Sequence, residues 1–137
     1  YISPDKKTPI PAAVLILLYP DNKQWHFFLT KRTNTVEHHK GQISLPGGVL
    51  ENNETLTEAA LRETHEEIGV SPELINVIGS LTSFHIPVSG FEIFPFIGWA
   101  KKEPQTIIEE DEVENIFSVS LDSLLDNDNQ KKKKRCA

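Results

Sequence analysis

The stretch from Gly48 to Val70 reads GVLENNETLTEAALRETHEEIGV, and it contains the start and stop signals of one helix. Thr55 and Glu58 have the spacing of a capping box, in which each side chain accepts a hydrogen bond from the other residue's backbone N–H. Gly69 is a natural C-terminal stop, because glycine enters the left-handed region without a Cβ clash. The sequence therefore predicts a helix over residues 56–68.

One face of this predicted helix changes from apolar to acidic along its length. Four residues recur at steps of four, three and four, and so share that face: Leu56, Ala60, Glu63 and Glu67. Glu66 stands beside them. Carboxylates this close repel one another unless they share a cation, and Mg²⁺ prefers oxygen ligands. Glutamate-rich helices are also common on protein surfaces, so the spacing alone leaves both a metal site and an ordinary charged helix open.

The segments around this helix have the composition of strands. Residues 12–19 and 25–32 are rich in apolar and β-branched residues, and the Pro-Asp-Asn-Lys segment between them predicts a hairpin. Residues 74–83 and 91–100 have a similar composition, and a short helix is predicted near residues 121–125. The order of these elements predicts a mixed α/β domain.

Length and composition limit what else the chain can be. A chain of 137 residues with 38% hydrophobic content is long enough for one domain and one core. The single cysteine, Cys136, has no partner for a disulfide within the chain, which favours a reducing compartment. The longest apolar run, residues 12–19, is shorter than the roughly 20 residues that span a bilayer, so we expect no membrane partner.

The net charge of -6 is unevenly distributed. Five of the fourteen basic residues lie in the run 131–135, which leaves the rest of the chain strongly acidic. An acidic body binds the nucleic-acid backbone poorly, because that binding depends on neutralising phosphates. We therefore expect no nucleic-acid partner, and we interpret the basic run as part of a solvated tail.

The stretch from Gly48 to Val70 resembles the signature of the Nudix hydrolase superfamily. Its fixed positions are all filled: Gly48, Glu54, Arg62, Glu63, Glu66, Glu67 and Gly69. Thr64 stands where the family usually has an aliphatic residue, so we expect slightly looser packing beneath the helix and no lost chemistry. The resemblance implies an α/β fold in which an α/β/α sandwich surrounds a mixed β-sheet.

The resemblance also implies a reaction, the hydrolysis of a diphosphate bond with Mg²⁺ or Mn²⁺. It makes Glu63, Glu66 and Glu67 the metal ligands, and makes Glu66 and Glu67 candidate catalytic carboxylates that orient or deprotonate water. Glu112, in the acidic loop 109–112, becomes a further catalytic or metal-binding candidate, although that loop is alternatively only solvated.

Arg62 has two possible roles in this signature. It lies at least a quarter turn from the acidic stripe, so we expect it to pair with Glu54 and fix the loop before the helix. The alternative role is a clamp on the substrate phosphates.

A second pattern precedes the first and resembles the coenzyme A diphosphatase subgroup. It comprises residues 28–33 (FLTKRT), Val36, His39, Gly41, Gln42 and residues 45–48 (LPGG). The subgroup splits coenzyme A into 3′,5′-ADP and 4′-phosphopantetheine. The resemblance of this pattern to the subgroup implies six substrate-binding candidates: Lys31, Arg32, His39, Gln42, Gly47 and Gly48. Alternatively, Arg32 ends a strand with a salt bridge, and His39 and Gln42 organise the loop.

Three functions remain open. The first is the coenzyme A or acyl-coenzyme A diphosphatase, and the second is a Nudix hydrolase acting on ADP-ribose, NADH or dinucleoside polyphosphates. The third is a non-catalytic binding module, because family members generally continue with another strand and helix where this chain has residues 126–137. We expect residues 1–125 to form the domain and residues 126–137 to be a disordered tail.

His85 lies in the segment 84–90, which contains proline and glycine and is expected to be a loop that borders a pocket. Cytoplasm is the default location, with the peroxisome and the mitochondrion as alternatives.

Overall fold

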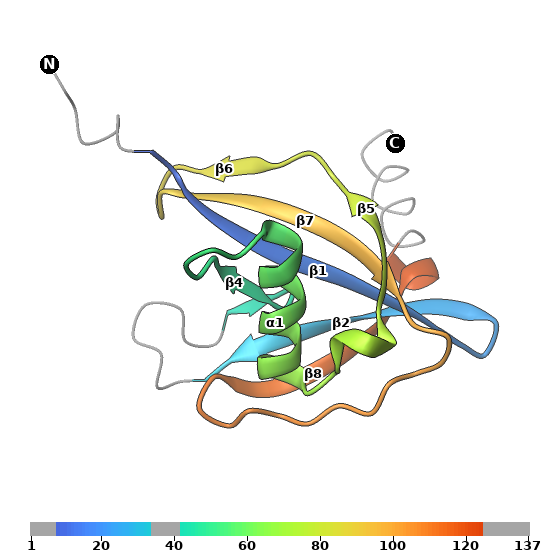
Figure 1. Cartoon of the computed structure of the whole chain (residues 1–137). Coiled ribbons are helices and arrows are strands. Elements are labelled where there is room, and N and C mark those ends of the chain that lie inside the picture. Colours follow the sequence, from blue (N-terminus) through green and yellow to red (C-terminus); the bar gives the residue numbers. More distant parts are fainter. Residues whose placement is uncertain (1–7, 34–41, 125–137) are drawn as a thin grey trace, which may run out of the picture.

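The computed structural model describes residues 8–33 and 42–124, which form a mixed β-sheet with one long helix packed against it (Figure 1). Predictions that fall on residues 1–7, 34–41 and 125–137, including those for His39 and the tail, lie outside the described residues. The elements in chain order are β1 (Ile10–Asp21), β2 (Gln24–Arg32), β3 (Ile43–Ser44), β4 (Gly47–Val49), α1 (Leu56–Ile68), the 3₁₀ helix η2 (Pro72–Leu74), β5 (Asn76–Ser80), β6 (Phe84–Ile86), β7 (Phe91–Trp99) and β8 (Val113–Ser120).

Strand β1 is the centre of the sheet. On one side its first half pairs with β4 and its second half with β2, both antiparallel. On the other side it pairs in parallel with β7, from Ile10 opposite Phe91 to Leu18 opposite Trp99, and this pairing makes the sheet mixed. Strands β5 and β6 extend the sheet from β7, while β3 and β8 pair with β2.

The predicted hairpin is confirmed. Strands β1 and β2 pair up to Asp21 opposite Gln24. Asn22 and Lys23 make the turn in the left-handed region, with φ angles of 53° and 65°. These angles match the right-handed twist of the flanking strands, which is why two-residue hairpins favour them.

The downstream strands differ in part from the predictions. The strand expected over residues 74–83 is shorter, because η2 takes its start and β5 covers only Asn76–Ser80. Strand β6 occupies the beginning of the segment 84–90, so the expectation of a loop there is wrong for its first three residues. Strand β8, which the sequence did not predict, pairs with β2, and residues 121–124 then form the predicted short helix.

Helix α1 begins and ends where the sequence predicted, at Leu56 and Ile68. The capping box is present: Glu58 N–H donates to Thr55 Oγ1 at 3.1 Å, and Thr55 N–H donates to a Glu58 carboxylate oxygen at 2.9 Å. Gly69 has φ 76°, and its N–H donates to the carbonyl of His65 at 2.9 Å. Local hydrogen bonds thus account for both ends of the helix.

The core lies between α1 and the β1 face turned toward it. Alternate residues of β1 are fully buried there, and the helix contributes small or aliphatic residues: Ala13, Leu15, Leu17 and Tyr19 from β1, and Ala59, Ala60 and Ile68 from α1. Thr64 is also fully buried, and its hydroxyl donates to the Ala60 carbonyl at 2.8 Å.

The predicted α/β fold class is confirmed, with α1 on one face of the mixed sheet (Figure 1). The described residues do not supply a second long helix for the opposite face, so the outer helical layer of the expected sandwich is not formed by them. None of the helices within residues 8–33 and 42–124 is long and apolar enough to cross a membrane.

Candidate metal and substrate site

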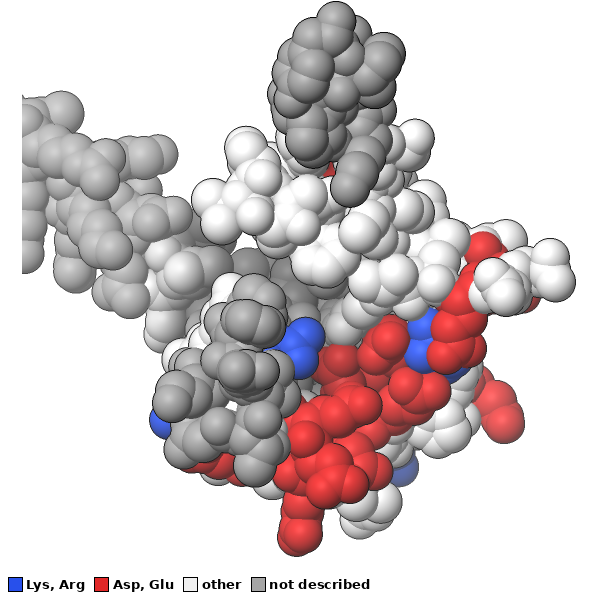
Figure 2. All heavy atoms as spheres, turned by 90° about the vertical axis from the view of Figure 1, so that its left-hand side faces the viewer, with Lys and Arg blue, Asp and Glu red and all other residues white. Residues whose placement is uncertain are grey.

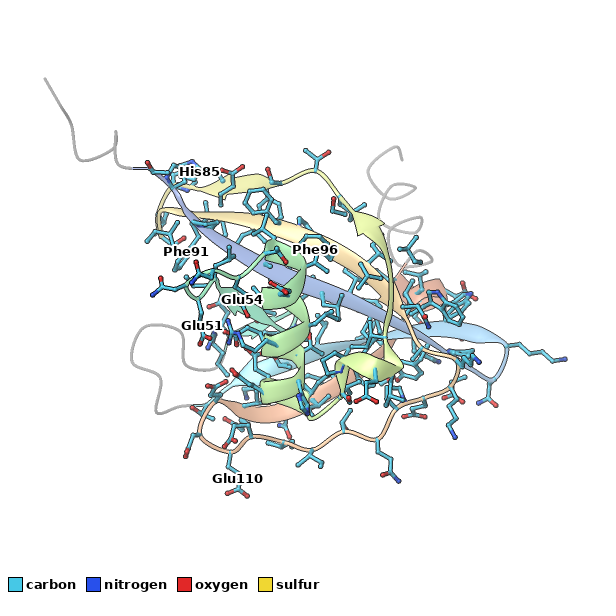
Figure 3. The ribbon with its side chains drawn as sticks, in the orientation of Figure 1. Glu51, Glu54, His85, Phe91, Phe96 and Glu110 are labelled. Atoms are coloured by element: carbon cyan, nitrogen blue, oxygen red, sulfur yellow. The ribbon has the colours of Figure 1, made fainter. Side chains whose placement is uncertain are left out.

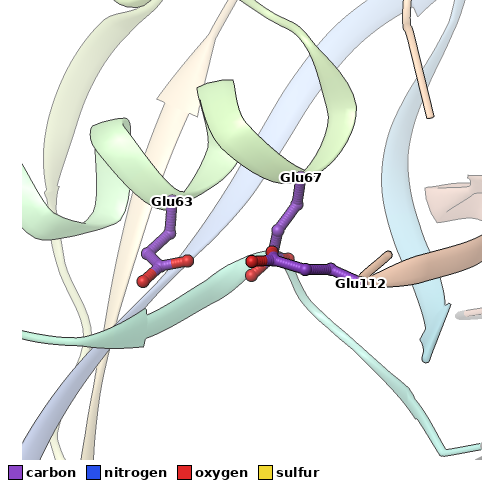
Figure 4. Close-up of side chains that lie close together, drawn as sticks. All are labelled: Glu63, Glu67 and Glu112. Carbon is purple, nitrogen blue, oxygen red and sulfur yellow. The ribbon is translucent and has the colours of Figure 1, made fainter. Parts of the chain in front are cut away.

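Acidic side chains gather over the side of the molecule that lies at the left of Figure 1 (Figure 2). The structure brings three carboxylates together: Glu63 and Glu67 from α1, and Glu112 from the loop before β8 (Figure 4). Their ligand oxygens all lie within 4.8 Å of one another. We call these three residues the acidic cluster.

Backbone hydrogen bonds hold the loop of Glu112 against the end of α1. Ile107 N–H donates to the carbonyl of Ile68 at 2.8 Å, and the next contact, Glu109 N–H to the Glu67 carbonyl, is 3.4 Å. Glu112 N–H then donates to the Glu109 carbonyl at 3.0 Å, which closes a turn. A residue distant in sequence is thereby fixed beside the two helix carboxylates.

The surroundings of the acidic cluster disfavour three free negative charges. Burial raises the pKa of Glu67 to about 8, with a further contribution from the neighbouring Glu63, while the positive charge of Arg32 opposes the shift. Burial also raises the pKa of Glu63. A hard divalent cation would neutralise this charge, and the donor set consists only of carboxylates, so the cluster fits Mg²⁺ or Mn²⁺.

Arg62 lies at the centre of a hydrogen-bond network beside the cluster. Its guanidinium donates to both carboxylate oxygens of Glu54, at 2.7 and 3.1 Å, and to the carbonyl of Val49 at 3.1 Å. It also donates to Glu63 at 3.1 Å and to Glu66 at 3.2 Å. These bonds raise the pKa of Arg62 and lower the pKa of Glu54. The predicted pairing of Arg62 with Glu54 is therefore present, and it connects the loop after β4 to the helix.

Glu66 does not join the acidic cluster. Its side chain is 49% exposed, and one of its carboxylate oxygens accepts a hydrogen bond from Arg62. The sequence grouped Glu66 with Glu63 and Glu67 because all three share the helix, whereas the structure places Glu112 in the third position. The metal and catalytic roles of Glu66 stay predictions.

A pocket of about 580 Å³ lies next to the acidic cluster. Four of the predicted substrate residues line it: Arg32, Gln42, Gly47 and Gly48. Lys31 does not, and its ammonium lies 3.6 Å from the carboxylate of Glu114. The remaining lining residues are mostly apolar: Ala12, Val14, Ser44, Leu45, Val49, Phe84, Ile86, Val88, Ser89, Phe91 and Ile93.

Gly48 connects this pocket to the acidic cluster. It lines the pocket, and a Cβ atom added to it would lie 2.4 Å from Oε2 of Glu63. Gly48 therefore borders both the pocket and that carboxylate. Arg32 makes a second connection, because it lines the pocket and its charge acts on Glu67. Among the described residues, no carboxylate lies within ion-pair distance of Arg32, so the salt bridge considered as its alternative role is not found there.

His85 is not among the residues that line the pocket, although its neighbours Phe84 and Ile86 are. Strand β6 explains this, because alternate residues of a strand point to opposite faces. The apolar lining was not predicted from the sequence, although the alternation at Phe84 and Ile86 and again at Phe91 and Ile93 indicates it.

A second depression, of about 510 Å³, is lined in part by Arg62. Glu51 and Glu54 line it, and they lie together beside the first turns of α1 (Figure 3). It contains no member of the acidic cluster, and the guanidinium that borders it is already bonded to carboxylates. Glu110, at the bottom of its loop in the same figure, lines neither depression.

Comparisons with known proteins show the family and the fold of this chain. The family model of the NUDIX domain matches residues 9–136. Nudix hydrolase 3 of Caenorhabditis elegans is 35% identical over 116 residues, or 82% of this chain and 48% of that protein. The mitochondrial Nudix hydrolase 15 of Arabidopsis thaliana is 35% identical over 136 residues, or 96% of this chain and 47% of that protein. The chain thus spans about half the length of these curated relatives.

Among solved structures, the Nudix hydrolase RenU of M. Smegmatis has a TM-score of 0.70 at 24% identity, over 86% of this chain and 74% of that chain. At this identity the likeness supports the fold alone. The mixed-sheet fold expected from the sequence resemblance is thereby confirmed.

Proposed function

Because this chain belongs to the Nudix family, we propose that it hydrolyses the diphosphate bond of coenzyme A or acyl-coenzyme A, giving 3′,5′-ADP and the corresponding 4′-phosphopantetheine. The observation that carries the proposal is the junction at Gly48. There a cluster of three carboxylates meets a pocket that contains Arg32 and Gln42. A diphosphate at this junction would place its bridging oxygen near the acidic cluster and its ester groups toward the pocket.

The metal ion belongs to the acidic cluster in this proposal. Glu63, Glu67 and Glu112 would hold Mg²⁺ or Mn²⁺. The bound cation would neutralise the negative charge that develops on the phosphoryl oxygens. Glu66 is the predicted additional ligand, and Arg62 donates hydrogen bonds to both Glu66 and Glu63.

Arg32 and the two glycines position the substrate. The guanidinium of Arg32 has no ion pair within residues 8–33 and 42–124, and a planar fork of donors suits a phosphate group. Gln42 offers an amide donor on the same side of the pocket. Gly47 and Gly48 let the chain approach the phosphates without side chains in between.

The attacking nucleophile is a water molecule that adds to phosphorus in line with the leaving oxygen. A carboxylate must orient it and accept its proton, and the candidates are Glu66, Glu67 and Glu112. Arg62 donates directly to one of these candidates, Glu66, and to the metal-ligand candidate Glu63, so it positions both side chains. Its own donors are engaged with four carboxylate or carbonyl partners, which favours the structural role over the phosphate clamp.

Support for coenzyme A over other diphosphates comes from the motif before the signature. Residues 28–33 and 45–48 resemble the coenzyme A diphosphatase subgroup, and two of its polar positions, Arg32 and Gln42, line the pocket. The second candidate is hydrolysis of ADP-ribose, NADH or a dinucleoside polyphosphate by the same cluster. The third is a binding module without turnover.

A product assay separates the three candidates. The purified chain is incubated with Mg²⁺ and either coenzyme A, ADP-ribose or a dinucleoside polyphosphate, beside the variants Glu67→Gln and Glu110→Gln. Release of 3′,5′-ADP and 4′-phosphopantetheine by the parent and Glu110→Gln, with a loss of at least about a hundredfold in Glu67→Gln, is the expected result. Faster cleavage of another diphosphate would replace coenzyme A as the proposed substrate. If the protein is folded and binds Mg²⁺ but cleaves none of the three diphosphates, the non-catalytic binding module is the remaining candidate.

A further inference from the structure

We infer that the pocket receives an apolar arm of the substrate on a surface formed by five residues, Phe84, Ile86, Val88, Phe91 and Ile93, and that the enzyme therefore prefers diphosphates that carry such an arm. We call these five residues the apolar wall. The inference rests on the proposed function, and it adds the part of the chain that selects among diphosphate substrates.

The register of β6 and β7 builds the apolar wall. Phe84 lies opposite Ile93, and Ile86 lies opposite Phe91, so these four side chains form two cross-strand pairs on one face of the sheet. The pair between them, His85 opposite Glu92, faces the other way. The short hairpin is thus apolar on its pocket side and polar on its other side, and Figure 3 shows His85 at the outer edge of β6.

The wall continues into a floor provided by β1. Ile93 lies beside Ala12 in the parallel pairing, and Ala12 and Val14 line the pocket on the face turned away from α1. Ala12 is small, which leaves room above it for a ligand. Val49, opposite Ala12 on β4, extends the same surface toward Gly48 and the acidic cluster.

Several of these apolar side chains are open to solvent in the described structure. Val88 is 99% exposed, Phe84 51% and Val49 41%. Exposed apolar surface of this kind gains free energy when a ligand removes it from water, and the gain grows with the apolar area that is covered.

The polarity of the pocket determines the kind of ligand. Arg32 and Gln42 lie at one end, next to the acidic cluster, and the apolar wall forms the other side. No described acidic or basic side chain lines the pocket apart from Arg32. A substrate that matches has a diphosphate at one end and an uncharged, largely aliphatic chain at the other. A second charged nucleotide in that place would lose its hydration against the wall without gaining a partner.

The test uses esters of 3′-phospho-ADP that differ only in the alkyl group on the terminal phosphate: methyl, butyl and octyl. We expect kcat/KM of the parent chain to rise about tenfold or more from methyl to octyl, since each buried methylene adds to binding. Phe84→Ser and Val88→Ser should each reduce that rise to about threefold or less. Ile78→Ser, which removes an exposed apolar side chain of β5 outside the pocket, is the matched control and should keep it.

Binding of non-hydrolysable methylene analogues of the three esters, measured by calorimetry, gives a readout that does not depend on turnover. If no ester is hydrolysed but affinity still increases with chain length in the parent and not in Phe84→Ser, the proposed function fails and the apolar-arm inference stands. Equal kcat/KM and equal affinity for all three esters would overturn the inference while leaving the hydrolase intact. An identical loss in Ile78→Ser would overturn it as well.

Discussion

Gly48 on β4 and Glu63 on α1 are packed so closely that a Cβ atom at Gly48 would lie 2.4 Å from Oε2 of Glu63. The contact involves the far end of a flexible side chain, whereas the same addition at Gly47 would lie 2.2 Å from the carbonyl oxygen of Ala13 in β1. The two adjacent glycines therefore serve different ends. Gly47 permits the pairing of β4 with β1, and Gly48 leaves space for a carboxylate of the acidic cluster.

Gly48→Ala is expected to displace the Glu63 carboxylate and leave the fold intact. Affinity for Mg²⁺ should fall about tenfold or more, as it does when groups that orient metal ligands are changed. Isothermal titration with Mg²⁺ and a circular dichroism spectrum measure the two effects. Gly79→Ala is the control, because a Cβ atom there meets nothing within 4 Å. Unchanged Mg²⁺ affinity in Gly48→Ala would contradict the role assigned to this contact.

Glu112→Gln should weaken divalent-cation binding more than Glu110→Gln. Both residues belong to the same acidic loop, but Glu112 alone of the two lies in the acidic cluster (Figure 4), and Glu110 lies at the bottom of the loop (Figure 3). We expect a loss of about tenfold to a hundredfold for Glu112→Gln and less than twofold for Glu110→Gln. Similar losses in the two variants would mean that the loop attracts cations only through its overall charge.

The Glu66→Gln variant tests whether Glu66 is a metal ligand or the general base that activates water. Its position outside the acidic cluster predicts that Mg²⁺ affinity changes less than in Glu63→Gln. If Glu66 accepts the proton of the attacking water, kcat should fall about a hundredfold or more at nearly unchanged affinity. Parallel losses in Mg²⁺ affinity and in kcat would instead show that Glu66 is a metal ligand, as the sequence resemblance implies.

The metal-free protein should lose stability as the pH rises. Burial raises the pKa of Glu67 from 4.5 to about 8, so the folded state favours the protonated carboxyl. The stabilisation from that proton is complete below about pH 4.5 and disappears as the pH passes through about 8. Thermal midpoints between pH 5 and 9 should fall by several degrees in the parent and less in Glu67→Gln. Saturating Mg²⁺ should flatten the parent curve. Equal slopes for the parent and the variant without metal would contradict the assignment.

Arg62→Lys is expected to lower the thermal midpoint by a few degrees. An ammonium group cannot reproduce the two parallel bonds that the guanidinium donates to Glu54, nor the bond to the Val49 carbonyl. The loop after β4 should loosen as a result, which hydrogen exchange at residues 50–54 would detect. A variant as stable and as protected as the parent would show that one charge is sufficient at this position.

Thr64→Val should leave activity unchanged and raise the free energy of unfolding by up to about 1 kcal/mol. Thr64 is fully buried, and its hydroxyl bonds the Ala60 carbonyl, which also accepts the helical bond. Valine keeps the shape and removes a polar group from the core. Urea unfolding measures the change, and a loss of more than about 1 kcal/mol would show that the hydroxyl bond is needed.

The sequence by itself determined helix α1 and its caps, the β1–β2 hairpin, and the pairing of Arg62 with Glu54. These features depend on hydrogen bonds and turn angles between residues close along the chain, so local chemistry is sufficient to predict them. The parallel pairing of β1 with β7, the strand β8 and the apolar wall depend on partners distant in sequence.

In the acidic cluster, too, part of the arrangement follows from local sequence and part from tertiary contacts. Helical spacing alone placed Glu63 and Glu67 on one face, but it also grouped Glu66 with them. Spacing along a helix does not indicate which of several adjacent glutamates is buried in the folded protein. In the tertiary structure Glu112, and not Glu66, lies beside Glu63 and Glu67. Backbone bonds from Ile107 and Glu109 to the end of α1 bring Glu112 into the cluster, while Arg62 holds Glu66 in solvent. Contacts of this kind form only when the loop before β8 packs against the end of α1, and no periodicity in the chain encodes them.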